Sequence, residues 1–170
     1  KGKKIRSLAS KIEGEICARL GATAVPMPLS EAMPALQNGV VDAARGATLV
    51  FVGFKYHAVA KYITALDDSV IPVVTMVSKE FYRKLPADLA KMVAETASGM
   101  DDWAQQLINV SEANAEKAWR EGGGEFIRLS PAEQAEVRKR HLPIADEILG
   151  TQADTKDMWN LLKQVAAKYK

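Results

Sequence analysis

One long helical pattern limits what this chain can fold into. From Pro86 the sequence runs about 35 residues without a firm stop, until three glycines at 122–124 end the pattern. Apolar residues recur through it at near-helical spacing: Leu89, Val93, Ala97, Met100, Ala104, Leu107 and Val110. Such a helix spans roughly 50 Å, more than a domain of this size needs, so we expect it to brace two bodies. A pair of helices meeting at a kink near Gly99 is the alternative.

The first 85 residues alternate between strand-like and helix-like segments. Strands are expected at 3–8, 23–27, 40–42, 62–66 and 70–78, the last interrupted by Pro72. Helices are expected at 10–21, 29–39 and 48–62, although the Val and Phe content of 48–62 leaves a strand open there. Strand–helix alternation predicts an α/β fold with crossover connections.

The segment after the long helix starts with a strand at 125–130. Ser130, Pro131 and Glu133 then form the pattern of a helix start, with an N-cap, a first-turn proline and a capping-box partner. That helix is expected to run towards Gly150 with a kink at Pro143. A last helix follows, capped by Thr151 or Thr155.

Composition and charge exclude several classes of protein. The 170 residues are 48% hydrophobic and 26% charged, which suits one globular domain with a core. Net charge is +2, and basic and acidic residues are mixed, so we expect no nucleic-acid partner. The basic start at 1–6 is expected to be a solvated edge. Because the chain begins with lysine, we expect a segment of a longer or processed protein.

Motifs of catalysis are missing from the sequence. It contains no Gly-rich phosphate loop, no metal-spaced Cys/His set and no nucleophile elbow. The single cysteine, Cys17, is expected to be a buried structural thiol. His57 is expected to pack in the interior and His141 to lie at the surface. We therefore expect a binding protein that is not an enzyme and uses neither cofactor nor metal.

Four blocks of the sequence, at 1–7, 20–43, 55–69 and 77–93, resemble the solute-binding proteins of TRAP transporters, the dicarboxylate-type periplasmic family. The most specific parts are "ALQNGVVDA" and a turn of the pattern S-x-x-x-Y-x-x-LP into the long helix. The resemblance covers essentially the entire chain. Family members are nearly twice as long, so this chain resembles the portion from mid-protein to the C-terminus. A first lobe and a signal peptide are expected upstream.

The resemblance implies a fold and a division of the chain. The fold is α/β, a lobe like that of the type II periplasmic binding proteins, with a mixed sheet, a long interlobe helix and C-terminal helices. Residues 1–85 correspond to the ligand-binding segment of the second lobe, and 86–121 to the spanning helix. Residues 122–170 correspond to a strand and helices that pack back on the lobes.

Arg6 occupies the place of the family arginine that pairs with the ligand carboxylate. A guanidinium suits this task because its planar fork matches two carboxylate oxygens and stays charged. A partly dry cleft strengthens such a pair. From the residues alone, an exposed strand charge beside Lys3 and Lys4 is the alternative.

Four further residues fall on the family's ligand cleft: Leu29, Arg45, Gly46 and Ser69. The small residues around Arg45 would let backbone N–H groups approach an anion. This sequence departs from the usual pattern, with Arg45 in place of a glutamate, Gly46 in place of an asparagine and "DDS" at 67–69 in place of Asn-His. Arg45 is expected either to supply a second positive group or to point to solvent.

The function implied by the resemblance is capture of a small organic carboxylate in the periplasm and delivery to TRAP membrane subunits. Two lobes would close on the solute, because the solute binds the closed state preferentially. The alternative is a sensor-associated or non-transport ligand-binding module, or a remnant without binding activity. A chain that lacks its first lobe would expose apolar faces, so we expect the fragment to self-associate.

Overall fold

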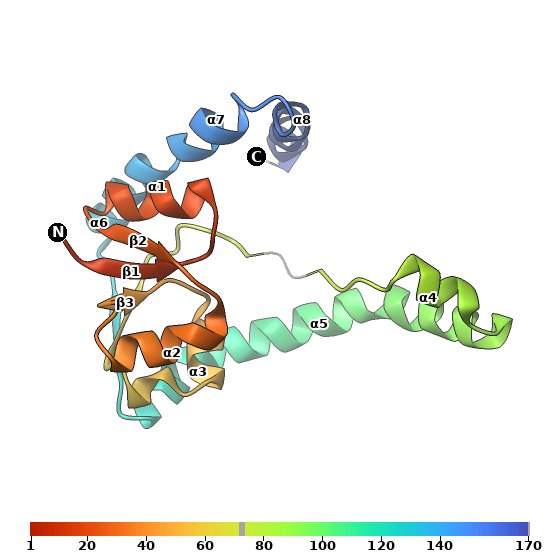
Figure 1. Cartoon of the computed structure of the whole chain (residues 1–170), viewed down its shortest axis with the longest axis horizontal. Helices are drawn as coiled ribbons and strands as arrows, with labels where there is room; N and C mark the ends of the chain where they lie inside the picture. Colours follow the sequence, from red (N-terminus) through yellow and green to blue (C-terminus); the bar gives the residue numbers. More distant parts are fainter. Residues whose placement is uncertain (72–73, 170) are drawn as a thin grey trace.

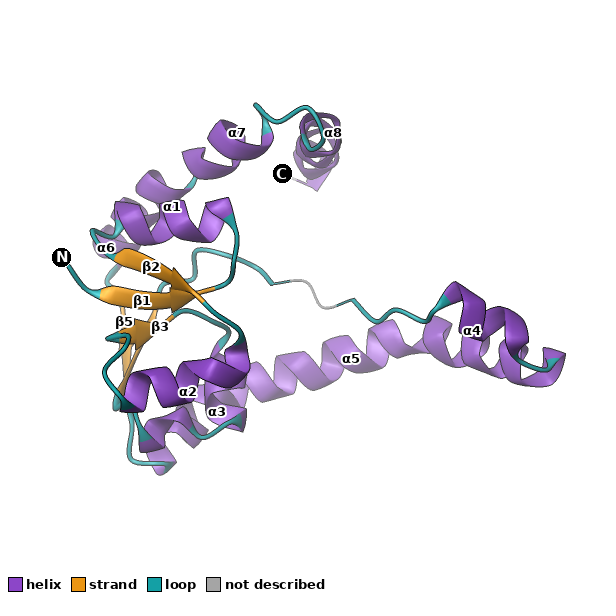
Figure 2. Cartoon of the chain, in the orientation of Figure 1, coloured by secondary structure: helices purple, strands orange, loops and turns teal. Residues whose placement is uncertain are grey.

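The computed structural model describes residues 1–71 and 74–169, which form an α/β body with a long helical arm (Figure 1). The strands all lie in the body, and the last helix, α8, stands apart from the arm (Figure 2). The described residues contain five strands: β1 (Lys4–Ser7), β2 (Thr23–Pro26), β3 (Ala43–Ala44), β4 (Tyr62–Ala65) and β5 (Glu125–Arg128). The α-helices of the body are α1 (Lys11–Arg19), α2 (Leu29–Gln37), α3 (Thr48–Gly53), α6 (Pro131–His141) and α7 (Pro143–Leu149). The remaining helices are α4 (Lys79–Lys84), α5 (Ala87–Glu121) and α8 (Lys156–Ala166), with short 3₁₀ turns at Tyr56–Ala58 and Ala167–Tyr169.

Two small parallel sheets organise the body. The first has the strand order β2-β1-β3, and the second pairs β4 with β5. The expected α/β fold is confirmed, but the expected mixed sheet is wrong for the described residues, whose strand pairs are all parallel. The reason is that a helical crossover returns the chain to the end of the sheet from which it started.

The third strand lies later than expected. Val40 and Val41 belong to the turn that leaves α2, where Gly39 takes a φ of +67°, and the paired residues are Ala43 and Ala44. Asp42 therefore precedes the strand, and its carboxylate accepts hydrogen bonds from the Lys4 N–H and the Lys3 ammonium, both at 2.8 Å. The acidic residue thus anchors β3 to the start of β1.

Two other expected elements differ from the structure. The helix expected at 48–62 stops at Gly53, because Lys55 adopts a left-handed φ of 55°, and a 3₁₀ turn and β4 follow. The strand expected at 70–78 is wrong for residues 70, 71 and 74–78, which are irregular and exposed, while 72–73 lie outside the described residues. A strand there would need a neighbour to satisfy its backbone groups.

The core of the body forms where α5 enters it. Trp119, Tyr56, Ile63 and Ala32 make one buried cluster. The indole Nε1 of Trp119 donates to the Glu125 carbonyl at 3.1 Å. His57 packs edge-on against Trp119 with ring centroids 5.8 Å apart, which confirms its expected packing role.

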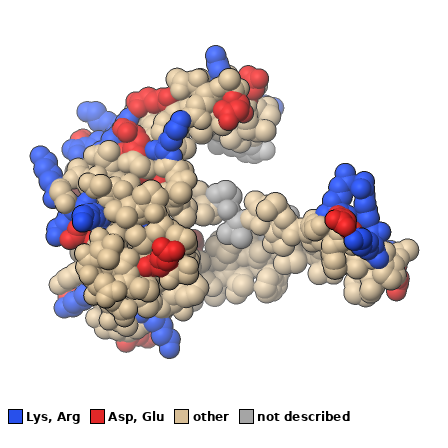
Figure 3. Space-filling model, in the orientation of Figure 1, with Lys and Arg blue, Asp and Glu red and all other residues tan. Residues whose placement is uncertain are grey.

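The long helix is continuous from Ala87 to Glu121, so the kinked pair of helices is not what forms. Ala115 and Trp119 near its end are buried in the body, but its apolar residues between positions 89 and 110 are largely exposed. The helix α4 lies against its start, where the Tyr82 hydroxyl donates to the Ala90 carbonyl at 2.9 Å. On the visible face the tip of the arm gathers basic side chains, whereas the middle carries few charges (Figure 3).

The C-terminal elements follow the sequence signals closely. Ser130 and Glu133 form the expected capping box at the start of α6. Pro143 begins a new helix, α7, so the expected kink becomes a break between two helices. Thr155 is the N-cap residue of α8, but its side chain makes no capping bond.

Candidate ligand-binding site at the carboxyl ends of the strands

Arg6 is a buried charge on the central strand of the first sheet. Only 2% of the residue is exposed. Its Nε donates to the Met27 carbonyl at 3.0 Å, and its Nη1 donates to the Arg45 carbonyl at 3.2 Å. Met27 directly follows β2 and Arg45 directly follows β3. The segments after both neighbouring strands of β1 therefore hold the Arg6 guanidinium. The alternative of an exposed strand charge is wrong.

The third guanidinium nitrogen of Arg6, Nη2, lacks a hydrogen-bond acceptor among the described residues. This atom is also buried. A buried charged donor without an acceptor is costly, and both of its existing acceptors are neutral carbonyls. The site therefore has unused capacity to bind an anion.

Arg45 lies beside Arg6 but already has anionic partners. Its Nε contacts Glu13 Oε2 at 3.0 Å and its Nη1 contacts Asp68 Oδ2 at 2.9 Å. Only 13% of the Arg45 side chain is exposed. The expectation that Arg45 points to solvent is wrong, because two carboxylates hold it inside. Ser69 lies at the same place, with its hydroxyl 3.4 Å from Arg45 Nη2.

His141, which was expected at the surface, belongs to this cluster as well. Its Nδ1 lies 2.8 Å from Asp68 Oδ2 and its ring is buried, so the surface prediction is wrong. A signal was present: Val137, His141, Ile144 and Ile148 recur at helical spacing, which places the histidine on an apolar face. Its Nε2 is buried without a partner among the described residues.

Opposite charges set the ionisation of the cluster. Burial acts to raise the pKa of the Asp68 carboxyl, but the hydrogen bond and charge of Arg45, with help from His141, outweigh burial and lower it. Burial acts to lower the pKa of Arg45, yet Glu13 and Asp68 together raise it. In the same region, burial raises the pKa of the Cys17 thiol, and the expected buried structural role of this cysteine is confirmed.

The two remaining predicted site residues, Leu29 and Gly46, both pack against neighbouring side chains. Leu29 is half-buried at the start of α2 and packs against the core cluster, and its carbonyl accepts from the Tyr56 hydroxyl at 3.4 Å. Gly46 follows β3, and a Cβ at this position would lie 3.1 Å from Cζ of Phe51. The close ring therefore favours a small residue at position 46.

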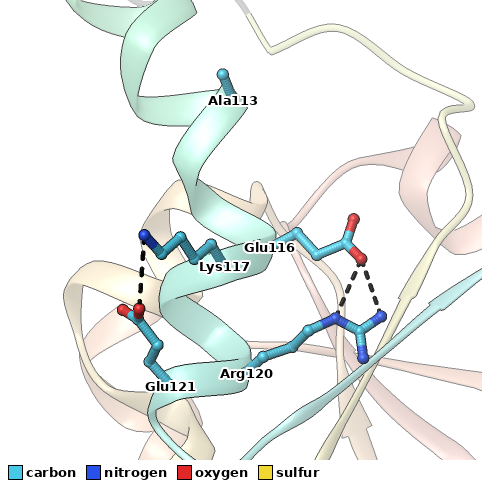
Figure 4. Close-up of a pocket in the computed structure, with 5 residues that line it drawn as sticks. All are labelled: Ala113, Glu116, Lys117, Arg120 and Glu121. Carbon is cyan, nitrogen blue, oxygen red and sulfur yellow. Dashed lines mark hydrogen bonds and ion pairs between the residues drawn. The ribbon is translucent and has the colours of Figure 1, made fainter.

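A separate hollow of about 380 Å³ lies on the outer surface of α5, far along the chain from Arg6 (Figure 4). Its charged residues pair with one another, Glu116 with Arg120 at 2.9 Å and Lys117 with Glu121 at 3.8 Å. Since these charges are already balanced, the hollow offers no charge for an ionic ligand. Among the side chains that the structure describes, no three from His, Cys, Asp or Glu gather as a metal site would require. None of the described helices has the length and apolarity needed to span a membrane.

These features define an α/β lobe whose candidate binding group is a buried arginine on the central strand of a parallel sheet. Residues 1–152 match the family of bacterial extracellular solute-binding proteins, family 7, also called DctP. The chain belongs to this family. The C4-dicarboxylate-binding periplasmic protein DctP of Rhodobacter capsulatus is 30% identical over 149 residues, which are 86% of this chain and 44% of that protein.

Solved structures share the fold. A TRAP periplasmic solute-binding protein from Rhodoferax ferrireducens with bound malonate superposes with a TM-score of 0.83 at 24% identity, covering 99% of this chain and 54% of that one. A relative from Xanthobacter autotrophicus Py2 with bound β-D-galacturonate gives 0.80 at 27% identity, covering 96% and 54%. This chain therefore spans about half the length of the relatives it matches.

Proposed function

We propose that this chain is the C-terminal part of a periplasmic solute-binding protein of a TRAP-type transporter, and that it captures a small organic carboxylate through Arg6. One observation carries the proposal: Arg6 is buried on the central strand of the first sheet, and its Nη2 has no partner among the described residues. A carboxylate would supply the missing acceptor and the missing negative charge together.

The class of solute follows from the same group. The guanidinium selects an anion, and its planar shape favours a carboxylate over a spherical ion. The relatives named above carry malonate or galacturonate, or are named for C4-dicarboxylates, and each of these solutes has at least one carboxylate. We propose that Leu29, Gly46 and Ser69 flank the solute, and that no nucleic acid, cofactor or metal takes part.

We propose a separate role for each of three consecutive segments of the chain. Residues 1–85 bind the solute, 86–121 span the two lobes, and 122–170 pack back on them. Closure of the two lobes would bury the solute and present the closed surface to the TRAP membrane subunits, because the solute stabilises the closed state. The alternative, a sensor-associated or non-transport module or a remnant without binding, predicts no delivery to a membrane partner.

The test is a thermal-shift titration of the full-length protein with malonate, succinate and galacturonate. We expect at least one acid to raise the melting temperature of the wild type, because a ligand that binds only the folded state stabilises it. Arg6→Met should abolish that rise. The matched control is Arg19→Met, which removes a guanidinium that pairs with Glu15 and Glu147 and donates to the Arg140 carbonyl, and that makes no hydrogen bond to a proposed solute contact. An equal rise in the wild type and in Arg6→Met would refute the role of Arg6.

A further inference from the structure

Arg45 contacts Arg6 through its main chain. The N–H of Arg45 donates to the Arg6 carbonyl at 2.8 Å, and the Arg45 carbonyl accepts from Nη1 of Arg6 at 3.2 Å. The strand β3 that leads into this contact has only two residues. Two residues of pairing hold a chain weakly, so another interaction must fix the place of the Arg45 carbonyl.

The side chain of Arg45 supplies that interaction. Its guanidinium joins Glu13 of α1 to Asp68 of the loop after β4, and Asp68 in turn contacts His141 at the end of α6. Two elements, α1 and the loop after β4, thus hold the Arg45 side chain directly, and α6 contacts Asp68 in turn. Since these groups are largely buried, the ion pairs are screened little by water and resist displacement.

The cluster also keeps its own charges away from Arg6. Glu13 and Asp68 are both directed to Arg45, while Arg6 receives neutral carbonyls only. An arginine already paired with a carboxylate would have little attraction left for an anionic solute. Arg45 therefore leaves Arg6 both correctly placed and without a counter-charge.

We propose that Arg45 is a positioning residue for solute binding: its buried ion pairs with Glu13 and Asp68 fix the main-chain carbonyl that orients the Arg6 guanidinium and leaves Nη2 free. This inference rests on the proposed function of Arg6 and assigns to Arg45 no contact with the solute. It differs from a purely structural role because it requires that the geometry of Arg6 change when the Arg45 side chain is altered.

The first readout needs no solute. In the full-length protein, the Nε–H of Arg6 is bound to the Met27 carbonyl and should give a distinct, slowly exchanging ¹H–¹⁵N resonance. Arg45→Met should shift this resonance or make it exchange faster, whereas the control Arg19→Met should leave it unchanged. An Arg6 resonance that is the same in Arg45→Met and in the wild type would overturn the proposal, whether or not any solute binds.

The second readout is the affinity for malonate, measured by calorimetry on the same full-length variants. Arg45→Met should weaken binding by about tenfold or more, the scale at which loss of an orienting contact weakens metal sites. Arg45→Lys should be intermediate, because lysine keeps the charge but cannot hold both carboxylates in a planar fork. Arg19→Met should bind malonate as the wild type does. Wild-type affinity in Arg45→Met would contradict the proposal.

A triple variant separates positioning from charge and guards against misfolding. Glu13→Gln, Asp68→Asn and Arg45→Met together remove the ion pairs without leaving an unpaired buried charge. If Arg45 positions Arg6, this variant should fold and still bind malonate weakly. Full recovery of affinity would show that Arg45 acts only by neutralising carboxylates, and the positioning role would be wrong. Absence of malonate, succinate and galacturonate binding by the wild type would refute the proposed function, while the resonance of Arg6 would still decide the positioning role.

Discussion

Two neighbouring arginines in this lobe are buried for different reasons. Arg6 has only neutral acceptors and one unpartnered nitrogen, whereas Arg45 has two carboxylates. The guanidinium of Arg6 therefore has a nitrogen that is still able to donate to an anion, whereas the charge of Arg45 is already neutralised by its two carboxylate partners. This difference leads to opposite expectations for their removal.

We expect Arg6→Met to change the free energy of unfolding of the ligand-free protein by no more than about 1 kcal/mol. Loss of two hydrogen bonds to carbonyls is offset by removal of a buried, unneutralised charge. Arg45→Met should cost about 3 kcal/mol, because it leaves Glu13 and Asp68 buried without a counter-charge. Denaturant titrations of the two variants check this order, and a larger loss for Arg6→Met than for Arg45→Met would contradict it.

Asp68 should make stability fall in acid. Its folded-state pKa is lowered, so its contribution to stability is fully present above the unfolded-state pKa of about 4 and is lost as the pH falls through the folded-state pKa. The difference in unfolding free energy between the wild type and Asp68→Asn should therefore be largest above about pH 5 and shrink towards pH 3. Glu95→Gln, which removes an exposed carboxylate from α5, is the control. A difference that stays constant from pH 6 to pH 3 would rule this out.

At the scale of elements, the helix α5 has two unlike halves. Its end is anchored by Trp119 in the core, whereas its first half projects with apolar side chains exposed, among them Met92 at 60% and Trp103 at 60%. Propensity and local contacts therefore decide the stability of the first half, and tertiary packing decides that of the second.

Replacing Gly99 or Gly124 by alanine should change stability in opposite directions. Gly99 lies within the arm with nothing close to an added Cβ, so Gly99→Ala should stabilise the helix locally by about 1 kcal/mol. At Gly124 an added Cβ would clash with Nε1 of the Trp119 indole, so Gly124→Ala should disrupt the core and destabilise the body. Amide hydrogen exchange around position 99 and thermal unfolding measure the two effects. Faster exchange in Gly99→Ala, or an unchanged melting temperature in Gly124→Ala, would contradict the respective prediction.

At the scale of the whole molecule, the arm and α8 leave apolar faces uncovered. Leu161 and Leu162 on α8 are 52% and 53% exposed, in addition to the apolar residues of the arm. Contiguous apolar patches of this kind are rare on the surface of a folded monomer and usually mark a contact with another surface. In the complete protein we propose that the remaining half of the molecule supplies it.

The 170-residue chain by itself should therefore self-associate at micromolar concentration. Burial of apolar surface between copies is favourable by about 25 cal/mol per Å², so even partial coverage of the arm would hold copies together. Light scattering measures the mass in solution. Replacing Leu161 and Leu162 by glutamate should reduce the association. A clean monomer of the unmodified chain would show that the exposed faces do not attract one another.

The alternation of elements could be predicted from sequence because it depends on local patterns. The capping box at Ser130 and the helix ending at Gly122 rest on contacts between residues close in the chain. Arg6 could be singled out through a resemblance, because its strand lies in a characteristic stretch. The long helix could be predicted from its spacing, but a kink near Gly99 remained open, and only the structure decided that the helix is continuous there.

The candidate site could not be completed from sequence, because its contacts join distant residues. Arg45 and Asp68 are 23 positions apart, and Asp68 and His141 are 73 apart. Local patterns determine where helices and strands begin and end, since their hydrogen bonds are made within a few residues. Only the tertiary structure decided which charges meet, because burial and pairing depend on how the elements pack. For that reason the resemblance could only predict Arg6 as the binding group, and the structure was needed to show that Arg6 has neutral partners while Arg45 has carboxylates.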